Sequence, residues 1–283
     1  MSNLDYPDYI RSLEQDTRTL VLTDRPTPAV AIVRMNDPEN QNALSGALTV
    51  QLRRALEQLT ADPDLRVLVL TGEGGFFSVG GDWKLMTDRA HTYAERSEGT
   101  TGLWKWIRYQ FGGIARIIRQ TDKVVIAALN GPAAGVALAW ALTSDLVLAS
   151  EEARLVTAFG RIGLVPEVGT NWALTRRLGY QRAFELFLRG NVLTAREAHE
   201  MGLVNAVVPA DHLRDLTRDW CDRVCRLPEH VVTMTKPLMR AAADMTWEQS
   251  VLAEEFAEPS TFTTRAHQET VRALLAKIER AGS

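Results

Sequence analysis

Two glycine-containing turns, each following an apolar β-branched run, are the segments of this chain best suited to do chemistry. The first is Leu70–Lys84 (LTGEGGFFSVGGDWK) and the second is Ala127–Ala139 (AALNGPAAGVALA). A helix that starts near Gly135 would leave its first backbone N–H groups without intrahelical partners, at the positive end of the helix dipole. Two such turns could each direct one backbone N–H at the same anionic oxygen, which is the arrangement of an oxyanion hole.

Other familiar sites fit these residues less well. A dinucleotide-binding fingerprint fails at its third glycine, where Phe77 stands, and no Gly-Lys-Ser/Thr follows to make a P-loop. The G-x-S-x-G elbow of a serine hydrolase is absent. Cys221 and Cys225 have no second pair of ligands nearby, so two reduced thiols on a helix are a better interpretation than a zinc site or a disulfide.

Composition points to a globular protein in a reducing compartment. The chain has 283 residues, 46% of them hydrophobic, and a net charge of −3, which argues against nucleic acid or an anionic membrane as its main partner. Its first residues are acidic and polar, unlike a secretory signal, and its most apolar region, 124–149, is interrupted by polar and turn residues. We therefore expect a cytoplasmic protein that does not cross a membrane.

The elements that must hold the two turns alternate between strand and helix, which predicts an α/β fold with parallel strands. The expected strands are 19–23, 30–35, 67–71, 124–129 and 146–149. The expected helix 43–59 has one apolar face and Ser45 as its N-cap. We expect three regions, namely an N-terminal extension (1–18), an α/β core with the active site (19–209) and a C-terminal helical module (210–283).

The segment 86–121 differs from its surroundings, because it begins polar and charged and then carries four aromatic residues, Trp104, Trp106, Tyr109 and Phe111. One interpretation is a loop leading into a helix that walls a pocket, with the aromatic side chains facing a bulky substrate. The other is an ordinary amphipathic helix whose aromatic side chains pack in the core or at a subunit contact. The sequence leaves both open.

At the two glycine turns the chain resembles the enoyl-CoA hydratase/isomerase (crotonase) family. Five collinear segments carry the resemblance: Asn42-Ala-Leu, Phe77-Ser-Val-Gly-Gly-Asp-Trp-Lys, Ile126-Ala-Ala-Leu-Asn-Gly-Pro-Ala-Ala-Gly, Ile162-Gly-Leu-Val-Pro and Ala198-His-Glu-Met-Gly-Leu-Val-Asn-Ala-Val-Val-Pro. The resemblance implies a spiral of repeated β-β-α turns with a C-terminal helical oligomerisation module. It also implies a homotrimer or homohexamer and an acyl-CoA thioester substrate. No cofactor would be tightly bound, since coenzyme A is part of the substrate.

The resemblance also assigns roles to residues. The oxyanion donors would be the backbone N–H groups of Gly81 and Val136. Asp82 would fix the turn through hydrogen bonds, and Lys84, with Lys277 or Arg280, would reach the CoA phosphates. The remaining implied substrate and CoA contacts are Val79, Gly80, Trp83 and Gly135.

The carboxylates distinguish the reactions that this scaffold hosts. A hydratase of the family uses two glutamates to handle water and the C2 proton, but Ala139 and Phe159 stand at the two corresponding positions. Glu167 instead resembles the single acid of family members that isomerise Δ3-enoyl-CoA to Δ2-enoyl-CoA. Asp145 is expected to be structural, and the histidines His91, His199 and His212 offer no better base.

Three hypotheses follow. The first is an enoyl-CoA isomerase-like enzyme in which Glu167 is the acid/base, inside an apolar surround that raises the pKa of its carboxyl. The second keeps the scaffold and changes the reaction to hydration, decarboxylation, ring chemistry or thioester hydrolysis on a specialised acyl-CoA. The third is a CoA-binding homologue without catalytic activity.

Overall fold

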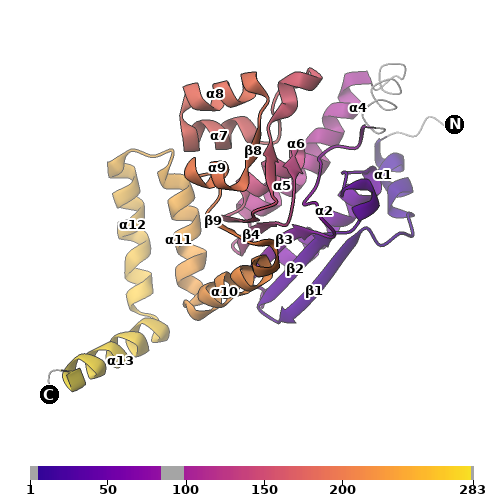
Figure 1. The fold of residues 1–283 in the computed structure, drawn as a ribbon. Coiled ribbons are helices and arrows are strands. Elements are labelled where there is room, and N and C mark those ends of the chain that lie inside the picture. Colours follow the sequence, from indigo (N-terminus) through magenta and orange to yellow (C-terminus); the bar gives the residue numbers. More distant parts are fainter. Residues whose placement is uncertain (1–5, 84–98, 282–283) are drawn as a thin grey trace. The chain divides into compact units, whose positions relative to one another are not determined.

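The computed structural model describes residues 6–83 and 99–281, and its contacts divide the chain into two compact units, Met1–Cys221 and Asp222–Ser283 (Figure 1). The division falls inside helix α10 (Leu213–Arg226), whereas the sequence placed it after residue 209. The 19–209 and 210–283 regions therefore stay a prediction, and each unit is described by itself.

A six-stranded sheet forms the centre of the first unit, in the order β1-β2-β3-β4-β6-β9. Its strands are β1 (Val21–Thr27), β2 (Val30–Met35), β3 (Val67–Gly72), β4 (Val124–Leu129), β6 (Leu146–Ser150) and β9 (Ala206–Val208). All neighbours pair in parallel except β1, which forms an antiparallel hairpin with β2. The five predicted strands are thus confirmed, and the prediction of parallel pairing is wrong for β1 alone.

The inner strands are apolar on both faces because helices cover the sheet. In β4, with the sequence VVIAAL, every residue is buried, and β3 is buried at all but one position. A continuous apolar run of this kind is typical of a parallel strand covered on both sides. The carboxyl ends of β3 and β4 lead directly into the two glycine turns, so the sheet sets where those turns lie.

A second, three-stranded sheet escaped the sequence analysis. It consists of β5 (Ala133–Ala134), β7 (Arg154–Val156) and β8 (Val192–Thr194), with β5 parallel and β8 antiparallel to β7. Strands of two or three residues carry no alternation that a sequence pattern could detect.

The helices of the first unit precede, separate and follow its strands along the chain. They are α1 (Tyr6–Glu14), α2 (Gly46–Thr60), α4 (Gly99–Trp106), α5 (Gly112–Gln120), α6 (Gly135–Thr143), α7 (Thr170–Leu178), α8 (Tyr180–Arg189) and α9 (Ala195–Glu200), with α10 crossing into the second unit. The predicted N-cap of α2 is confirmed, since Ser45 Oγ accepts a hydrogen bond from Leu48 N at 3.3 Å.

Helix α1 lies before the first strand and packs on the start of α2. Glycine at position 46 permits this packing, because a Cβ would lie 2.6 Å from Tyr9 Oη and 2.8 Å from a Leu13 methyl and would force these side chains to shift. The N-terminal segment is also held by Glu14, which pairs with Arg54 at 2.6 Å. Residues 6–18 of the N-terminal extension are thus a packed part of the first unit.

The described part of the aromatic segment forms α4, one π-helical turn (Ile107–Phe111) and α5. Trp106 and Phe111 belong to the hydrophobic core, whereas Trp104 and Tyr109 are about half exposed. Packing in the core therefore accounts for two of the four aromatic residues. Residues 84–98, with Lys84 and His91, lie outside the described residues.

The second unit consists of the end of α10 and three helices, α11 (Glu229–Ala242), α12 (Trp247–Phe262) and α13 (Arg265–Ala281). These helices confirm the helical character expected of the C-terminal residues. Across the described ranges 6–83 and 99–281, no helix combines the length and apolar character needed to span a bilayer.

Candidate functional site

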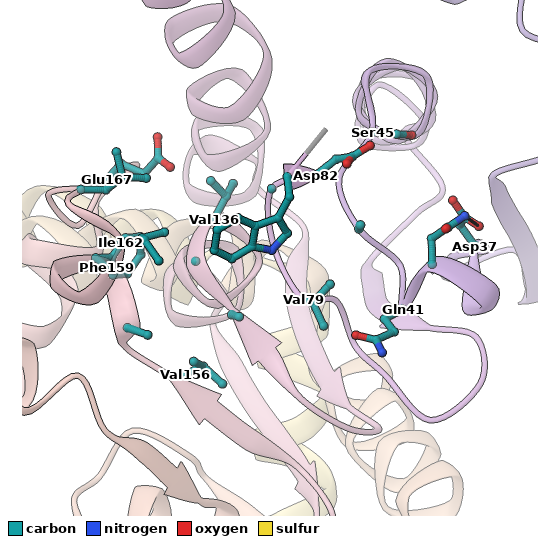
Figure 2. Close-up of a pocket in the computed structure, with 18 of the residues that line it drawn as sticks. Asp37, Gln41, Ser45, Val79, Asp82, Val136, Val156, Phe159, Ile162 and Glu167 are labelled. Carbon is teal, nitrogen blue, oxygen red and sulfur yellow. Dashed lines mark hydrogen bonds between the residues drawn. The ribbon is translucent and has the colours of Figure 1, made fainter. Parts of the chain in front are cut away.

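A cavity of about 770 Å³ opens where the two glycine turns meet the segment that carries Glu167 (Figure 2). Glu167, Phe159 and Ile162 lie on one side of Val136, and Asp82 and Ser45 lie on the other. The lining is completed by Arg18, Asp37, Glu39, Asn40, Gln41, Ala43, Val79, Gly81, Trp83, Ala134, Gly135, Val156, Ala158 and Leu164.

Backbone pairing holds the two turns side by side. Ser78 and Ala133 form a parallel bridge, in which Ser78 N donates to Pro132 O at 3.0 Å and Ala134 N donates to Ser78 O at 3.0 Å. The first turn is also bridged to the segment before α2, because Leu44 N donates to Gly80 O at 2.8 Å. Three segments distant in sequence are therefore fixed against each other at the cavity.

Glycine is required where the turns touch. Gly80 has a φ of +85°, and a Cβ on it would lie 2.7 Å from Ala134 O and 3.5 Å from Gly135 Cα. Gly135 has a φ of +54°, and although a Cβ on it would meet Gly80 Cα only at an ordinary contact distance of 3.9 Å, this backbone conformation favours glycine. Only a residue without Cβ enters these conformations without strain and permits this approach of two backbones.

The predicted oxyanion donors lie on this contact. Gly81 follows Gly80 directly, and Val136 is the second residue of α6, so its N–H belongs to the first turn of a helix. Among the residues that the structure describes, neither N–H has an acceptor. Both residues line the cavity, where the helix dipole of α6 adds a favourable potential for an anion.

Two asparagines, the buried Asn42 and the partly exposed Asn130, shape the first turn. Asn42 has a φ of +54°; its amide nitrogen donates to Glu73 O at 3.0 Å and Phe76 O at 2.8 Å, and its amide oxygen accepts from Asp37 N. Asn130 holds the same turn from the other side by donating to Gly74 O at 2.8 Å. The sequence motifs contained both asparagines, but only the structure shows that their side chains bond to the backbone of the first glycine turn, at Glu73, Gly74 and Phe76.

Glu167 is a half-buried residue of the cavity wall. No described residue donates a hydrogen bond to its carboxylate or forms an ion pair with it. Burial is the one cause that raises the pKa of Glu167 above its ordinary value of 4.5, to about 7. A carboxyl with this pKa exists in both protonation states at neutral pH, as a group that removes and returns a proton requires.

The turn after Glu167 is strained. Val168 has a φ of +56°, a region that β-branched residues rarely enter, and Gly169 follows with a φ of +90°. Such a conformation costs about 1 to 3 kcal/mol and persists only where surrounding contacts enforce it. Thr170, which is fully buried, supplies such contacts through two hydrogen bonds to Glu167 O.

The two positions expected to hold glutamate in a hydratase are apolar and buried. Ala139 lies inside α6 with no exposed surface, and Phe159 is 5% exposed and lines the cavity. Phe159 therefore contributes an apolar wall on the side where Glu167 lies. The cavity holds one carboxyl on this side, and Asp37, Glu39 and Asp82 are its other acidic lining residues.

Most of the remaining predicted site residues lie at the cavity, but the two lysines do not belong to its described lining. Val79, Asp82, Trp83 and Gly135 line the cavity, and Gly80 lies in the turn next to it, while their contacts with substrate or CoA stay a prediction. Lys84 lies outside the described residues, and Lys277 is an exposed residue of α13 in the second unit. The role of either lysine at the CoA phosphates stays a prediction.

Other residues considered at the sequence level take structural roles. Asp145 Oδ2 accepts from Val125 N at 2.8 Å, which links the sheet strands β4 and β6. His199 Nδ1 is 2.9 Å from Val204 O, and His212 is an exposed residue beside Asp211. None of these residues lines the cavity.

The structure adds residues that the sequence analysis did not assign to the site. Arg18, Ser45, Val156 and Ile162 line the cavity, and Thr170 supports Glu167. None of the four aromatic residues of the 99–120 segment contributes to the lining. Cys221 and Cys225 are free thiols, and among the described residues no three His, Cys, Asp or Glu side chains gather as a metal site would require.

Comparison with known proteins gives one consistent result. The enoyl-CoA hydratase/isomerase family model matches residues 26–280. A probable enoyl-CoA hydratase of Mycobacterium tuberculosis is 34% identical over 238 residues, which cover 81% of this chain and 80% of that protein. The 1,2-epoxyphenylacetyl-CoA isomerase of Escherichia coli K12 is 31% identical over 248 residues, covering 88% of this chain and 92% of that enzyme.

Solved structures agree on the fold. An enoyl-CoA hydratase/isomerase from Cupriavidus metallidurans matches with a TM-score of 0.81 and 29% identity, over 93% of this chain and 95% of that one. An enoyl-CoA hydratase from Bacillus anthracis matches with a TM-score of 0.82 and 26% identity, over 91% and 96%. The α/β unit with a helical C-terminal region is therefore a crotonase-like fold.

Proposed function

The chain belongs to the enoyl-CoA hydratase/isomerase family, and we propose that it is an acyl-CoA enzyme that stabilises a thioester enolate and shifts a double bond from Δ3 to Δ2. Its acid/base is Glu167, and its oxyanion donors are the N–H groups of Gly81 and Val136. The observation that carries the proposal is the Glu167 carboxyl, whose pKa burial raises to about 7 and which has no partner among the described residues, in one cavity with two backbone N–H groups that have no described acceptor.

The reaction needs one proton carrier. Glu167 removes a proton from C2 of the acyl group, and the electron pair of that C–H bond moves into the thioester carbonyl. The backbone N–H groups of Gly81 and Val136 hold the resulting oxyanion, a type of interaction whose loss typically costs a hundredfold or more in rate. Protonated Glu167 then returns the proton at C4, which leaves the double bond between C2 and C3.

Apolar residues at the hydratase positions support this choice over hydration. Addition of water needs a second group to orient and activate the water molecule, and Ala139 and Phe159 cannot do so. The Phe159 ring also excludes water from the side of the cavity where Glu167 lies, which helps to keep the carboxyl pKa raised.

A second candidate is isomerisation or ring chemistry on a specialised acyl-CoA. The 31% identity with an enzyme named 1,2-epoxyphenylacetyl-CoA isomerase favours it. Such a reaction would use the same enolate-stabilising groups and differ in the acyl group. The large apolar lining residues Phe159, Ile162 and Leu164 suit a bulky acyl group as well as a linear one.

Solvent exchange tests the proposal. We expect that the protein, incubated in D₂O with acyl- and enoyl-CoA esters from short linear to aromatic chains, introduces deuterium at C2 or C4, and that Glu167→Gln abolishes this exchange while still binding CoA esters. The products distinguish double-bond migration from ring chemistry. Measurable CoA binding without exchange on any ester would refute the proposal and favour a non-catalytic CoA-binding role.

We also propose that the protein assembles as a homotrimer or homohexamer and uses no tightly bound cofactor. Large apolar side chains of the second unit are exposed, among them Trp247 at 75% and Phe256 at 80%, and surfaces of this kind usually mark contacts between proteins. Light scattering on the purified protein decides the point, because a monomer at micromolar concentration would exclude both assemblies.

A further inference from the structure

The turn that carries Glu167 holds the most unfavourable backbone conformation in the described part of the chain. Among the described residues, three that are not glycine have a positive φ: Gln41, Asn42 and Val168. Asparagine enters this region readily, since its short polar side chain can bond locally. Val168 has no polar side-chain atom to form such a bond, and its branched Cβ makes a φ of +56° a genuine outlier.

Contacts on both sides of Glu167 enforce this conformation. Before it, Pro166 O accepts a hydrogen bond from Asn171 Nδ2 at 2.8 Å. Glu167 O itself accepts from Thr170 N at 3.0 Å and from Thr170 Oγ1 at 2.7 Å. After it, the Val168 side chain packs against the hydrophobic core. Two consecutive carbonyls and one apolar side chain are thus fixed.

The carboxylate of Glu167 lacks the support that orients most acid/base residues. No described residue donates a hydrogen bond to it or pairs with it. Its direction into the cavity therefore depends on where the backbone places its Cα–Cβ bond. If residue 168 left the left-handed region, the peptide after Glu167 would rotate and the carboxyl would leave its half-buried place.

We infer that Val168 is a positioning residue for the reaction: its side chain anchors a strained turn in the core, and that turn aims Glu167 at the substrate. The inference rests on the proposed function, in which Glu167 is the acid/base. Glycine would adopt the same φ without strain but would have no side chain to bind the turn to the core. Unfavourable backbone conformations held in this way are typical of sites where a group must be preorganised.

The test compares valines of the same segment. Val168→Ala removes the anchor, and Val165→Ala removes an equal volume from a side chain that is 76% exposed and outside the cavity lining. Val168→Ile keeps a branched apolar anchor and should behave like the unchanged protein. We expect Val168→Ala to lower the C2 exchange rate by about 10- to 100-fold, as expected for a misplaced reacting group, with the Kd for the CoA ester within about twofold.

A second readout does not depend on turnover. The Glu167 carboxyl can be followed by ¹³C NMR in the ligand-free protein and assigned by its loss in Glu167→Gln. In Val168→Ala we expect its pKa to fall from about 7 towards 4.5, because the released carboxyl reaches water. A purely structural role for Val168 would lower stability and leave this pKa unchanged.

If Val168→Ala does not fold, Thr170 provides the same test. Thr170→Val removes the hydroxyl that bonds to Glu167 O, and Thr170→Ser keeps it, so only the first should lower the Glu167 pKa and the exchange rate. One outcome would overturn the inference and leave the proposed function standing. In that outcome the unchanged protein catalyses exchange, and Val168→Ala and Val165→Ala have equal exchange rates and equal Glu167 pKa values. No exchange on any ester would refute the function, and the NMR titration would still decide the role of Val168.

Discussion

The contact between the two glycine turns makes one substitution especially informative. Gly80→Ala places a Cβ 2.7 Å from Ala134 O and 3.2 Å from the carbonyl carbon of Ala134. Carbon–oxygen contacts across backbones normally lie at about 3.3 Å or more, so the two turns must separate by roughly 0.6 Å. The new side chain also meets a φ of +85°, which costs an L-residue about 1 to 2 kcal/mol.

This separation of the two turns matters because Gly81 belongs to the first turn and Val136 follows the second. If their N–H groups can no longer reach the same oxygen, the loss should equal that of one oxyanion donor, about a hundred- to a thousandfold in turnover. Gly75→Ala is the matched control, since no atom lies within 4 Å of its new Cβ. Deuterium exchange into the acyl-CoA measures the rate, and ligand titration measures the affinity of the free site.

Equal exchange rates in Gly80→Ala and Gly75→Ala would refute the reasoning, because they would mean that the contact between the turns does not set the position of the donors. A loss of exchange with full unfolding would not support it either. Circular dichroism of both variants should therefore remain that of the unchanged protein below its melting temperature.

Further predictions follow from the same structure. Exchange started by the Glu167 carboxylate should rise with pH through about 7 and level off above it, in a pH–rate profile that Glu167→Gln abolishes. Because burial raises the pKa of Glu167 from 4.5 to about 7, its charged form costs stability above pH 7 and nothing below pH 4.5, so Glu167→Gln should raise the thermal midpoint at pH 8 but not at pH 4. Gly46→Ala should destabilise the fold by about 1 to 3 kcal/mol in urea, because its Cβ would overlap Tyr9, and Tyr9→Ala should relieve part of that cost in the double variant. Asn42→Ala, which removes the buried amide that donates to the part-buried carbonyls of Glu73 and Phe76, should cost about 2 to 4 kcal/mol, whereas Asn36→Ala, which loses one exposed bond, should stay within about 1 kcal/mol; equal losses in the two would contradict the role given to Asn42.

Strongly patterned elements could be predicted from the sequence because local chemistry determines them. The VVIAAL run identifies β4 as a buried strand, and Ser45 marks the start of α2 by its capping hydroxyl. The glycine turns could be placed because a strand precedes each one. The segments that contradicted or escaped expectation are those whose structure depends on distant partners.

Three examples show the limit. The two residues of β5 become a strand only because Leu155 and Val156 lie beside them. Trp104 and Trp106 are indistinguishable by type, yet one is 52% exposed and the other is in the core. Nothing about valine at position 168 indicates a positive φ, since the intrinsic preference of valine is the opposite and tertiary contacts override it.

The asparagine contacts to the first glycine turn have a consequence for whether this site can be moved from one protein to another. Asn42 lies 31 residues before the carbonyl of Glu73 to which it bonds, and Asn130 lies 56 residues after the carbonyl of Gly74. Each contributes to a loop that neither contains. The shortest continuous piece of chain that includes Asn42, the first glycine turn and Glu167 therefore covers residues 42–167 and contains β3, β4 and β6 of the six-stranded sheet. The first turn exchanged alone between scaffolds would arrive without the groups that shape it, so we expect the site to transfer only together with these strands.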